Sequence, residues 1–197
     1  LERLCLVRLS PADYTAAVAD LAVREAAAAA AAPQRPLVHV PLGCPPLPDP
    51  RTGVYIGGYA ARCTEMAQAF LVRMGPVLET ARTILVLGTE ECMYPALVLG
   101  QALEAPGGRA VRCHATTRSP IGVSGMPGYP ITSGSRLPSF YAPGRTTYVY
   151  DQAPYDAVVV VSDTPSPALD ALWHLMGAWE PYGYGRFCYV RGGSDVW

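Results

Sequence analysis

Three expected strands end in polar, oxygen-rich segments that could contact a small ligand. The candidate ligand-binding residues in these segments are Gly88, Thr89, Glu90, Glu91, His114, Thr116, Thr117, Arg118, Ser119, Asp163 and Ser166. In open parallel sheets, ligands bind at the carboxyl ends of the strands. If the three strands are parallel, these residues would gather at one edge of the sheet and form a ligand-binding site.

Arg118 is the residue that would contact an anion at such a site. A guanidinium group can hold a phosphate through two parallel hydrogen bonds, and the neighbouring Thr and Ser hydroxyls could donate to its remaining oxygens. The N–H groups at the start of a helix could add further donors. The carboxylates of Glu90, Glu91 and Asp163 would then face sugar hydroxyls or a metal. The set suits a ribose or a sugar phosphate.

Each of these residues also has a purely structural interpretation. Thr89 and Ser166 could cap helices, because a hydroxyl accepts hydrogen bonds from the first N–H groups of a helix. Glu90 and Glu91 could complement a helix dipole, and Arg118 could pair with one of them. The clustering behind three strands, more than any single residue, favours a ligand site.

The composition excludes several kinds of chemistry. The chain of 197 residues has no lysine and no asparagine, so all 15 of its basic side chains are arginines. A Walker-type phosphate loop, a lysine Schiff base and a kinase-type catalytic lysine are therefore absent. The formal net charge of −1 gives no basic field for general nucleic-acid binding. RNA binding is a weaker alternative, because Tyr141, Tyr148 and Tyr150 lie near Arg136 and Arg145 and could stack bases.

The cysteines and histidines form no recognisable motif. The six cysteines show no CxxC spacing and no His at zinc-ligand spacing, so we predict reduced thiols and no bound zinc. Of the three histidines, only His114 lies at the end of an expected strand. A nucleophilic pair of Cys92 and His114 is an alternative that their spacing does not demonstrate. The glycines of residues 122–128 do not match GxGxxG, the dinucleotide fingerprint.

The first 52 residues are expected to supply a helix, a short strand and a loop. Ser10 can cap a helix with Pro11 at its first position, and this helix should run to Ala32. One strand follows, and then the prolines between Pro41 and Pro50 predict an ordered loop without regular elements. We expect residues 1–52 to form one compact unit with an α/β domain at residues 53–197.

Helices and strands alternate in the remaining chain. A helical pattern covers residues 60–82, where Gly75-Pro76 should break or kink it. Further strands are expected at residues 83–88, 109–114, 145–151, 156–162 and 186–191, and helices at residues 92–105 and 166–179. Fully apolar strands indicate a sheet covered on both faces. The predicted fold is α/β and Rossmann-like, a mostly parallel sheet flanked by helices.

The loop at residues 116–144 is too long for a simple connection and is typical of a segment that covers a site. No apolar run of about 18 residues and no signal-peptide pattern occurs, so we predict a soluble cytoplasmic protein without a membrane partner.

Residues 86–104 and 114–121 together resemble the TRSP domain family. They read VLGTEECMYPALVLGQALE and HATTRSPI, and the second contains the eponymous Thr117-Arg118-Ser119-Pro120. The resemblance covers roughly residues 53–197. It implies a domain that follows a phosphoribosyltransferase domain in bacterial gene clusters linked to tellurite resistance and stress response, and that helps to make or modify a nucleotide-like compound. An upstream transferase would also explain why the chain begins at Leu1.

Residues 158–167, VVVVSDTPSP, are similar to the phosphoribosyl pyrophosphate loop of phosphoribosyltransferases, but degenerate. Ser162 and Asp163 stand where such a loop needs two acids, and Pro165 and Pro167 replace glycine N–H donors. This predicts that the domain lacks full transferase activity. Mg²⁺ would be expected only with a ligand like phosphoribosyl pyrophosphate.

These observations favour an accessory domain that binds a nucleotide or phosphoribosyl ligand, or positions one for a partner phosphoribosyltransferase. Two alternatives stay open. One is an enzyme acting on a nucleoside-like metabolite, which would also need Glu90, Glu91 or Asp163 for turnover. The other is a protein-interaction or RNA-binding module without a small ligand.

Overall fold

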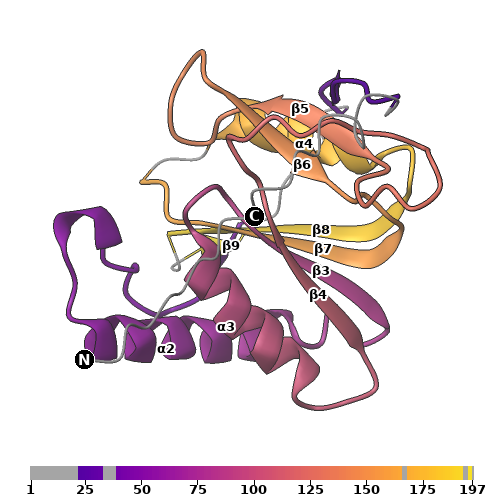
Figure 1. Cartoon of the computed structure of the whole chain (residues 1–197). Helices are drawn as coiled ribbons and strands as arrows, with labels where there is room; N and C mark the ends of the chain where they lie inside the picture. Colours follow the sequence, from indigo (N-terminus) through magenta and orange to yellow (C-terminus); the bar gives the residue numbers. More distant parts are fainter. Residues whose placement is uncertain (1–21, 33–38, 166–167, 193–194, 197) are drawn as a thin grey trace, which may run out of the picture.

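The computed structural model describes residues 22–32, 39–165, 168–192 and 195–196. Its elements are β1 (Ala27–Ala28), β2 (Val40–Pro41), the 3-10 helix η1 (Pro50–Thr52), α2 (Ile56–Met74), β3 (Thr83–Gly88), α3 (Met93–Glu104), β4 (Ala110–Ala115), β5 (Gly134–Pro138), β6 (Thr146–Tyr150), β7 (Tyr155–Ser162), α4 (Leu169–Trp179), β8 (Tyr184–Arg191) and β9 (Asp195–Val196). They form a six-stranded sheet, a three-stranded sheet and helices that cover the larger sheet (Figure 1).

The larger sheet has the strand order β2-β9-β8-β7-β3-β4. β3 pairs in parallel with β4 on one side and with β7 on the other, and β7 pairs in parallel with β8. β9 is antiparallel to β8, and β2 is antiparallel to β9. The carboxyl ends of β3, β4 and β7 therefore open on one edge, as the sequence predicts.

Both faces of this sheet are covered, which explains its continuous apolar strands. α2 and α3 lie on one face, and α4 lies on the other together with the small sheet (Figure 1). Phe70 and Leu99 of the first pair of helices are fully buried, as are Leu172 and Leu175 of α4. The prediction of a mostly parallel sheet flanked by helices is confirmed.

The long loop expected at residues 116–144 contains a strand. β5 pairs with β6 in an antiparallel register and with β1 in a parallel register. β5 is short and polar, so its sequence carries little of the apolar signal that marks a buried strand. β6, expected as a strand at residues 145–151, belongs to this small sheet, where it pairs with β5, and Tyr148 of β6 also bridges to Thr117.

The helix expected at residues 10–32 is wrong where the structure describes it. Residues 22–32 are extended: Arg24 bridges to Val123, and the N–H of Ala32 donates to the carbonyl of Trp173 at 2.9 Å. Helix propensity differs between residues by less than about 1 kcal/mol each, so tertiary pairing overrides it. Residues 10–21, with the predicted Ser10 cap, lie outside the described ranges.

The other helices follow the sequence pattern with shifted ends. α2 begins at Ile56 and stops at Met74, immediately before Gly75-Pro76. α4 begins at Leu169 with Ala168 at its N-cap, and the predicted cap Ser166 lies outside the described residues. None of the described helices is long and apolar enough to cross a membrane.

The proline-rich segment contains more regular structure than expected. Pro41 belongs to β2, an edge strand, where a missing N–H is tolerated. Pro50 opens η1 at a position where the N–H has no helical partner, and the Asp49 side chain accepts from the N–H of Arg51 at 2.9 Å. β9 also follows β8, which the sequence indicated as the last strand.

Gly177 allows the extended segment at residues 22–32 to pack against α4. A Cβ at this position would overlap the carbonyl oxygen of Ala30, a backbone atom that cannot rotate away. We therefore expect Gly177→Ala to lower the free energy of unfolding by about 1–3 kcal/mol in urea denaturation. Gly125→Ala is the control, because its Cβ position has no neighbour within 4 Å. Equal stability of the two variants would contradict this packing.

Candidate functional site

A pocket of about 400 Å³ opens at the carboxyl edge of β3 and β4. We call it the anion pocket. The end of β3, the first turn of α3 and the segment after β4 form its walls. Its lining residues are Glu90, Glu91, Met93, Ala115, Thr116, Thr117, Arg118 and Ser119. The structure therefore brings together most of the residues from the first two polar segments.

Arg118 is exposed in this pocket. Its Nη2 lies 2.5 Å from Oε1 of Glu91, and the two side chains are 57% and 50% exposed. Such exposed ion pairs contribute only about 0–1 kcal/mol to stability. Another anion could therefore replace Glu91 at the guanidinium group at little cost.

Two hydroxyls of the anion pocket accept hydrogen bonds from nearby backbone N–H groups. The hydroxyl of Thr116 accepts from the N–H of Glu90 at 2.8 Å, and that of Thr117 accepts from the N–H of Ser119 at 3.2 Å. A hydroxyl that accepts one bond can still donate another. Thr117 is held further by two backbone hydrogen bonds with Tyr148.

Glu90 lines the anion pocket, but its carboxylate is buried and does not face a ligand. Its side chain is 1% exposed and pairs with Nη2 of Arg145 at 2.7 Å, while the Ser139 hydroxyl donates to Oε1 at 2.6 Å. Its φ of 49° lies in the left-handed region, which is unusual for a non-glycine residue. The buried ion pair fixes the strained turn between β3 and α3.

Asp163 is likewise enclosed. Its side chain is 4% exposed, and it accepts from the Tyr141 hydroxyl at 2.5 Å and from Nη1 of Arg51 at 2.8 Å. The guanidinium group of Arg51 lies over the Tyr141 ring, 4.8 Å from its centroid. The hydrogen bond and charge of Asp163 raise the pKa of Arg51, and burial raises the pKa of Tyr141. These contacts close the crevice between the ends of β3 and β7.

Thr89 and Gly88 shape this closed crevice. The Thr89 hydroxyl lies 2.8 Å from that of Tyr141, and its backbone N–H donates to the carbonyl of Val161 at 3.0 Å. A Cβ at Gly88 would overlap the carbonyl oxygen of Cys92, so glycine lets α3 begin close to the strand. Both residues have structural roles here.

No local sequence signal indicates that Arg51 and Tyr141 are partners of Asp163. Arg51 follows the proline-rich stretch, 112 residues before Asp163. Tyr141 was a candidate for base stacking, but its hydroxyl is bound to Asp163 inside the fold. The length of the loop that carries Tyr141 was the available signal, because long loops often cover sites.

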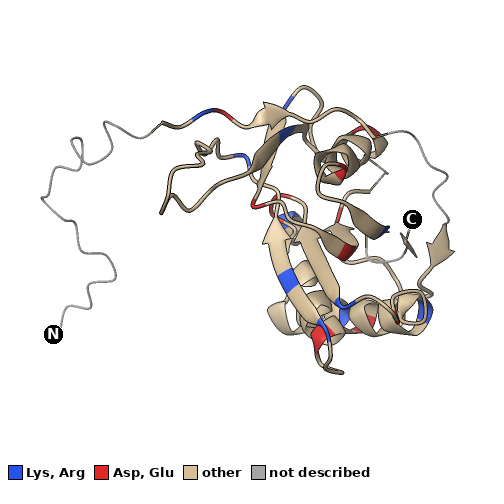
Figure 2. Ribbon diagram, turned by 90° about the vertical axis from the view of Figure 1, so that its right-hand side faces the viewer, with Lys and Arg blue, Asp and Glu red and all other residues tan. Residues whose placement is uncertain are grey.

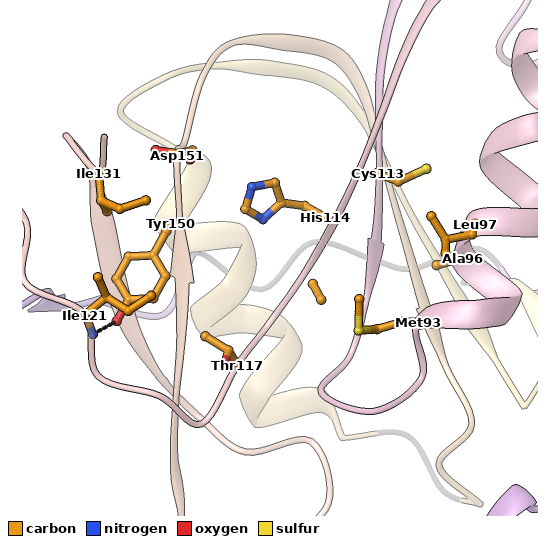
Figure 3. Close-up of a pocket in the computed structure, with 11 residues that line it drawn as sticks. Met93, Ala96, Leu97, Cys113, His114, Thr117, Ile121, Ile131, Tyr150 and Asp151 are labelled. Carbon is orange, nitrogen blue, oxygen red and sulfur yellow. Dashed lines mark hydrogen bonds between the residues drawn. The ribbon is translucent and has the colours of Figure 1, made fainter. Parts of the chain in front are cut away.

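His114 lines a second pocket of about 420 Å³, which we call the apolar pocket. Its lining residues are Met93, Ala96, Leu97, Cys113, His114, Ala115, Thr117, Ile121, Ile131, Tyr150 and Asp151. Figure 3 shows the His114 ring on the side of Tyr150 and Asp151, whereas Cys113 lies on the side of α3. The sequence identified His114 but not the apolar residues around it.

The other residues considered for base stacking, Tyr148, Tyr150 and Arg136, contact other side chains of the chain. The rings of Tyr148 and Tyr150 are stacked, with their centroids 6.1 Å apart, and Tyr150 is 5% exposed. Nη1 of Arg136 lies 4.0 Å from Oε2 of Glu25. Basic and acidic residues are interspersed along the ribbon (Figure 2).

The metal-ligating side chains are dispersed. No group of three or more His, Cys, Asp and Glu in the described ranges could hold a metal ion. Glu91 is the anion-pocket carboxylate that remains accessible to a cation brought in with a pyrophosphate, because Glu90 is engaged in its buried pair.

The fold and its edge pocket define a mixed α/β domain with a candidate small-ligand site. Residues 57–176 match the family described as the TRSP domain C terminus to PRTase_2. The chain belongs to this family. No curated protein and no solved structure matches it significantly.

The two Arg–Glu pairs provide a matched test of burial. Arg145→Ala would leave the carboxylate of Glu90 buried without its cation, and we expect a loss of about 3–5 kcal/mol. Arg118→Ala breaks an exposed pair and should cost at most about 1 kcal/mol. Urea denaturation of both variants measures the difference. A large loss of unfolding free energy in Arg118→Ala would show that Arg118 stabilises the fold.

Cys92 offers a test of the nucleophile alternative. Burial raises the pKa of its thiol, and the nearby Asp163 carboxylate acts in the same direction. Since only the thiolate reacts rapidly, we expect Cys92 to resist iodoacetamide at pH 8 in the folded protein and to react in urea. Mass spectrometry of the labelled peptides measures this. Rapid labelling of Cys92 in the folded state would restore the Cys92–His114 alternative.

Proposed function

We propose that this TRSP domain binds a nucleotide or phosphoribosyl ligand through its anion pocket. The observation that carries the proposal is the exposed guanidinium group of Arg118 at the carboxyl edge of parallel strands. Its counter-ion is an exposed, exchangeable carboxylate. The adjacent Thr117 and Ser119 bring hydroxyls of the kind that bind phosphate oxygens, whereas their N–H groups already donate within the fold.

The topology supports a ligand at this edge. The chain places β4 on one side of β3 and then crosses to β7 and β8 on the other side, an order expected of a Rossmann-like domain. Ligands of such sheets bind where the strand order reverses. Here Tyr141, Arg51 and Asp163 fill the crevice itself, so the ligand would use the neighbouring anion pocket.

An accessory role fits the chemistry better than transferase activity. The degenerate loop after β7 holds Asp163 in buried hydrogen bonds, and Pro165 has no N–H to offer a pyrophosphate. The description of the family places the domain C-terminal to PRTase_2. We infer that it supplies or positions a ligand for a phosphoribosyltransferase partner. A setting in tellurite resistance stays a prediction from the family resemblance.

Two substitutions in the anion pocket should change affinity in opposite directions. Hydrogen bonds to charged groups contribute about 1.5–3 kcal/mol, so we expect Arg118→Ala to weaken binding of ribose 5-phosphate or of phosphoribosyl pyrophosphate with Mg²⁺ by roughly 10- to 100-fold. Glu91→Gln removes the carboxylate that competes for Arg118 and should strengthen the binding of metal-free ribose 5-phosphate severalfold. Isothermal titration calorimetry measures both.

The control is Arg112→Ala, which removes an exposed arginine of β4 that lines neither pocket. It should bind like the unsubstituted chain. Equal affinity of a folded Arg118→Ala variant would refute the anion pocket. Absence of binding by every phosphate ligand would favour the interaction-module alternative, and release of pyrophosphate by the chain alone would favour the enzyme.

A further inference from the structure

The anion pocket and the apolar pocket adjoin each other. Both are lined by Met93, Ala115 and Thr117, and each has a volume of about 400 Å³. These volumes lie in the usual range of small-molecule sites. The phosphate contacts proposed above use the anion pocket and leave the apolar one unexplained.

The apolar pocket has hydrophobic walls and few polar groups. Met93, Ala96 and Leu97 of α3 form one side, and Ile121 and Ile131 lie across from them (Figure 3). Leu97 is 50% exposed, so this wall is open to a ligand.

The polar groups sit at its two ends. His114 and Asp151 lie toward one end, and Thr117 lies toward the other, beside the anion pocket (Figure 3). Apolar pockets with a few placed polar groups are typical of ligand sites.

One side chain connects the walls of the two pockets. The hydroxyl of Tyr150 accepts from the N–H of Ile121 at 2.6 Å and donates to the carbonyl of Ser119 at 3.1 Å. Ser119 lines the anion pocket, and Ile121 lines the apolar pocket. The two pockets are therefore held in a fixed relation to each other.

Backbone strain marks both pockets. Within the part of the chain that the structure describes, Glu90 and Asp151 are the non-glycine residues with positive φ, at 49° and 51°. Glu90 lines the anion pocket and Asp151 the apolar pocket. Strained residues persist where the surroundings hold them, and they cluster at ligand sites. Asp151 is held by a hydrogen bond from its N–H to the carbonyl of Ser133 at 3.1 Å.

We propose that the apolar pocket is a nucleobase subsite, so that the ligand is a nucleoside monophosphate with its phosphate at Arg118 and its base beside Leu97 and Met93. The inference rests on the proposed function and deepens it. A planar base suits apolar walls, and its edge needs polar partners, which His114 and Asp151 provide. An ionised carboxylate only accepts hydrogen bonds. Asp151 therefore selects a base that presents two neighbouring N–H donors, as guanine does.

The test compares ligands that differ in one feature. Isothermal titration calorimetry of the chain with GMP, IMP, ribose 5-phosphate and hexyl phosphate separates the base from the phosphate. We expect GMP to bind at least tenfold tighter than ribose 5-phosphate, and tighter than IMP, which lacks the exocyclic amino group.

Two variants locate the base, and a third serves as a control. Asp151→Asn should remove the preference for GMP over IMP, and asparagine tolerates the positive φ of this position. Leu97→Gln should weaken GMP severalfold and leave ribose 5-phosphate unchanged. Val72→Gln is the control for Leu97→Gln, because Val72 is 75% exposed on α2 and lines neither pocket.

The outcomes separate this inference from the proposed function. Binding of ribose 5-phosphate that depends on Arg118, with no gain from GMP, would overturn the nucleobase subsite and leave the anion pocket intact. The subsite would also be wrong if hexyl phosphate matched GMP, or if Leu97→Gln bound GMP normally. If none of the four ligands bound, both proposals would fail.

Discussion

The parallel pairing of β3 with β4 on one side and β7 on the other constrains everything at the candidate site. All three strands must end at the same edge, so the residues that follow them are brought together although they are separated by dozens of positions in the chain. The pairing requires that both faces of β3 be covered, and its residues Ile84 to Leu87 are accordingly buried between α3 and α4. The candidate site therefore lies on strands that are held in place by their pairing and by buried side chains on both faces.

Two of the three acidic residues at that edge, Glu90 and Asp163, hold the fold, and the third, Glu91, forms an exposed ion pair. Glu90 binds Arg145 and Ser139, which fixes the segment after β5 over the end of β3. Asp163 binds Tyr141 and Arg51, which closes the crevice beside β7. Charges enclosed in this way are costly to separate and hold their surroundings in one arrangement. Glu91, in contrast, meets its arginine at the surface.

The limits of the sequence interpretation follow from the range of the forces involved. β3, α3 and β7 were located within a few residues, because apolar runs and proline positions are local signals. The alanine-rich segment was misassigned, because its extended form depends on contacts with β5 and α4. β5 has too few apolar residues to be recognised alone. Of the site, the sequence located the residues that follow the strands, but it could not indicate that Arg51, Tyr141 and Arg145 would reach them from distant loops.

Glu91 stands between two guanidinium groups, at 2.5 Å from Arg118 and 3.9 Å from Arg51. Its negative charge is therefore divided between an open pocket and a closed crevice. An anion that displaces Glu91 from Arg118 leaves more of that charge to Arg51, which already binds Asp163. An anion bound at Arg118 would therefore also change, through Glu91, the charge that surrounds Arg51 at the closed crevice beside β7.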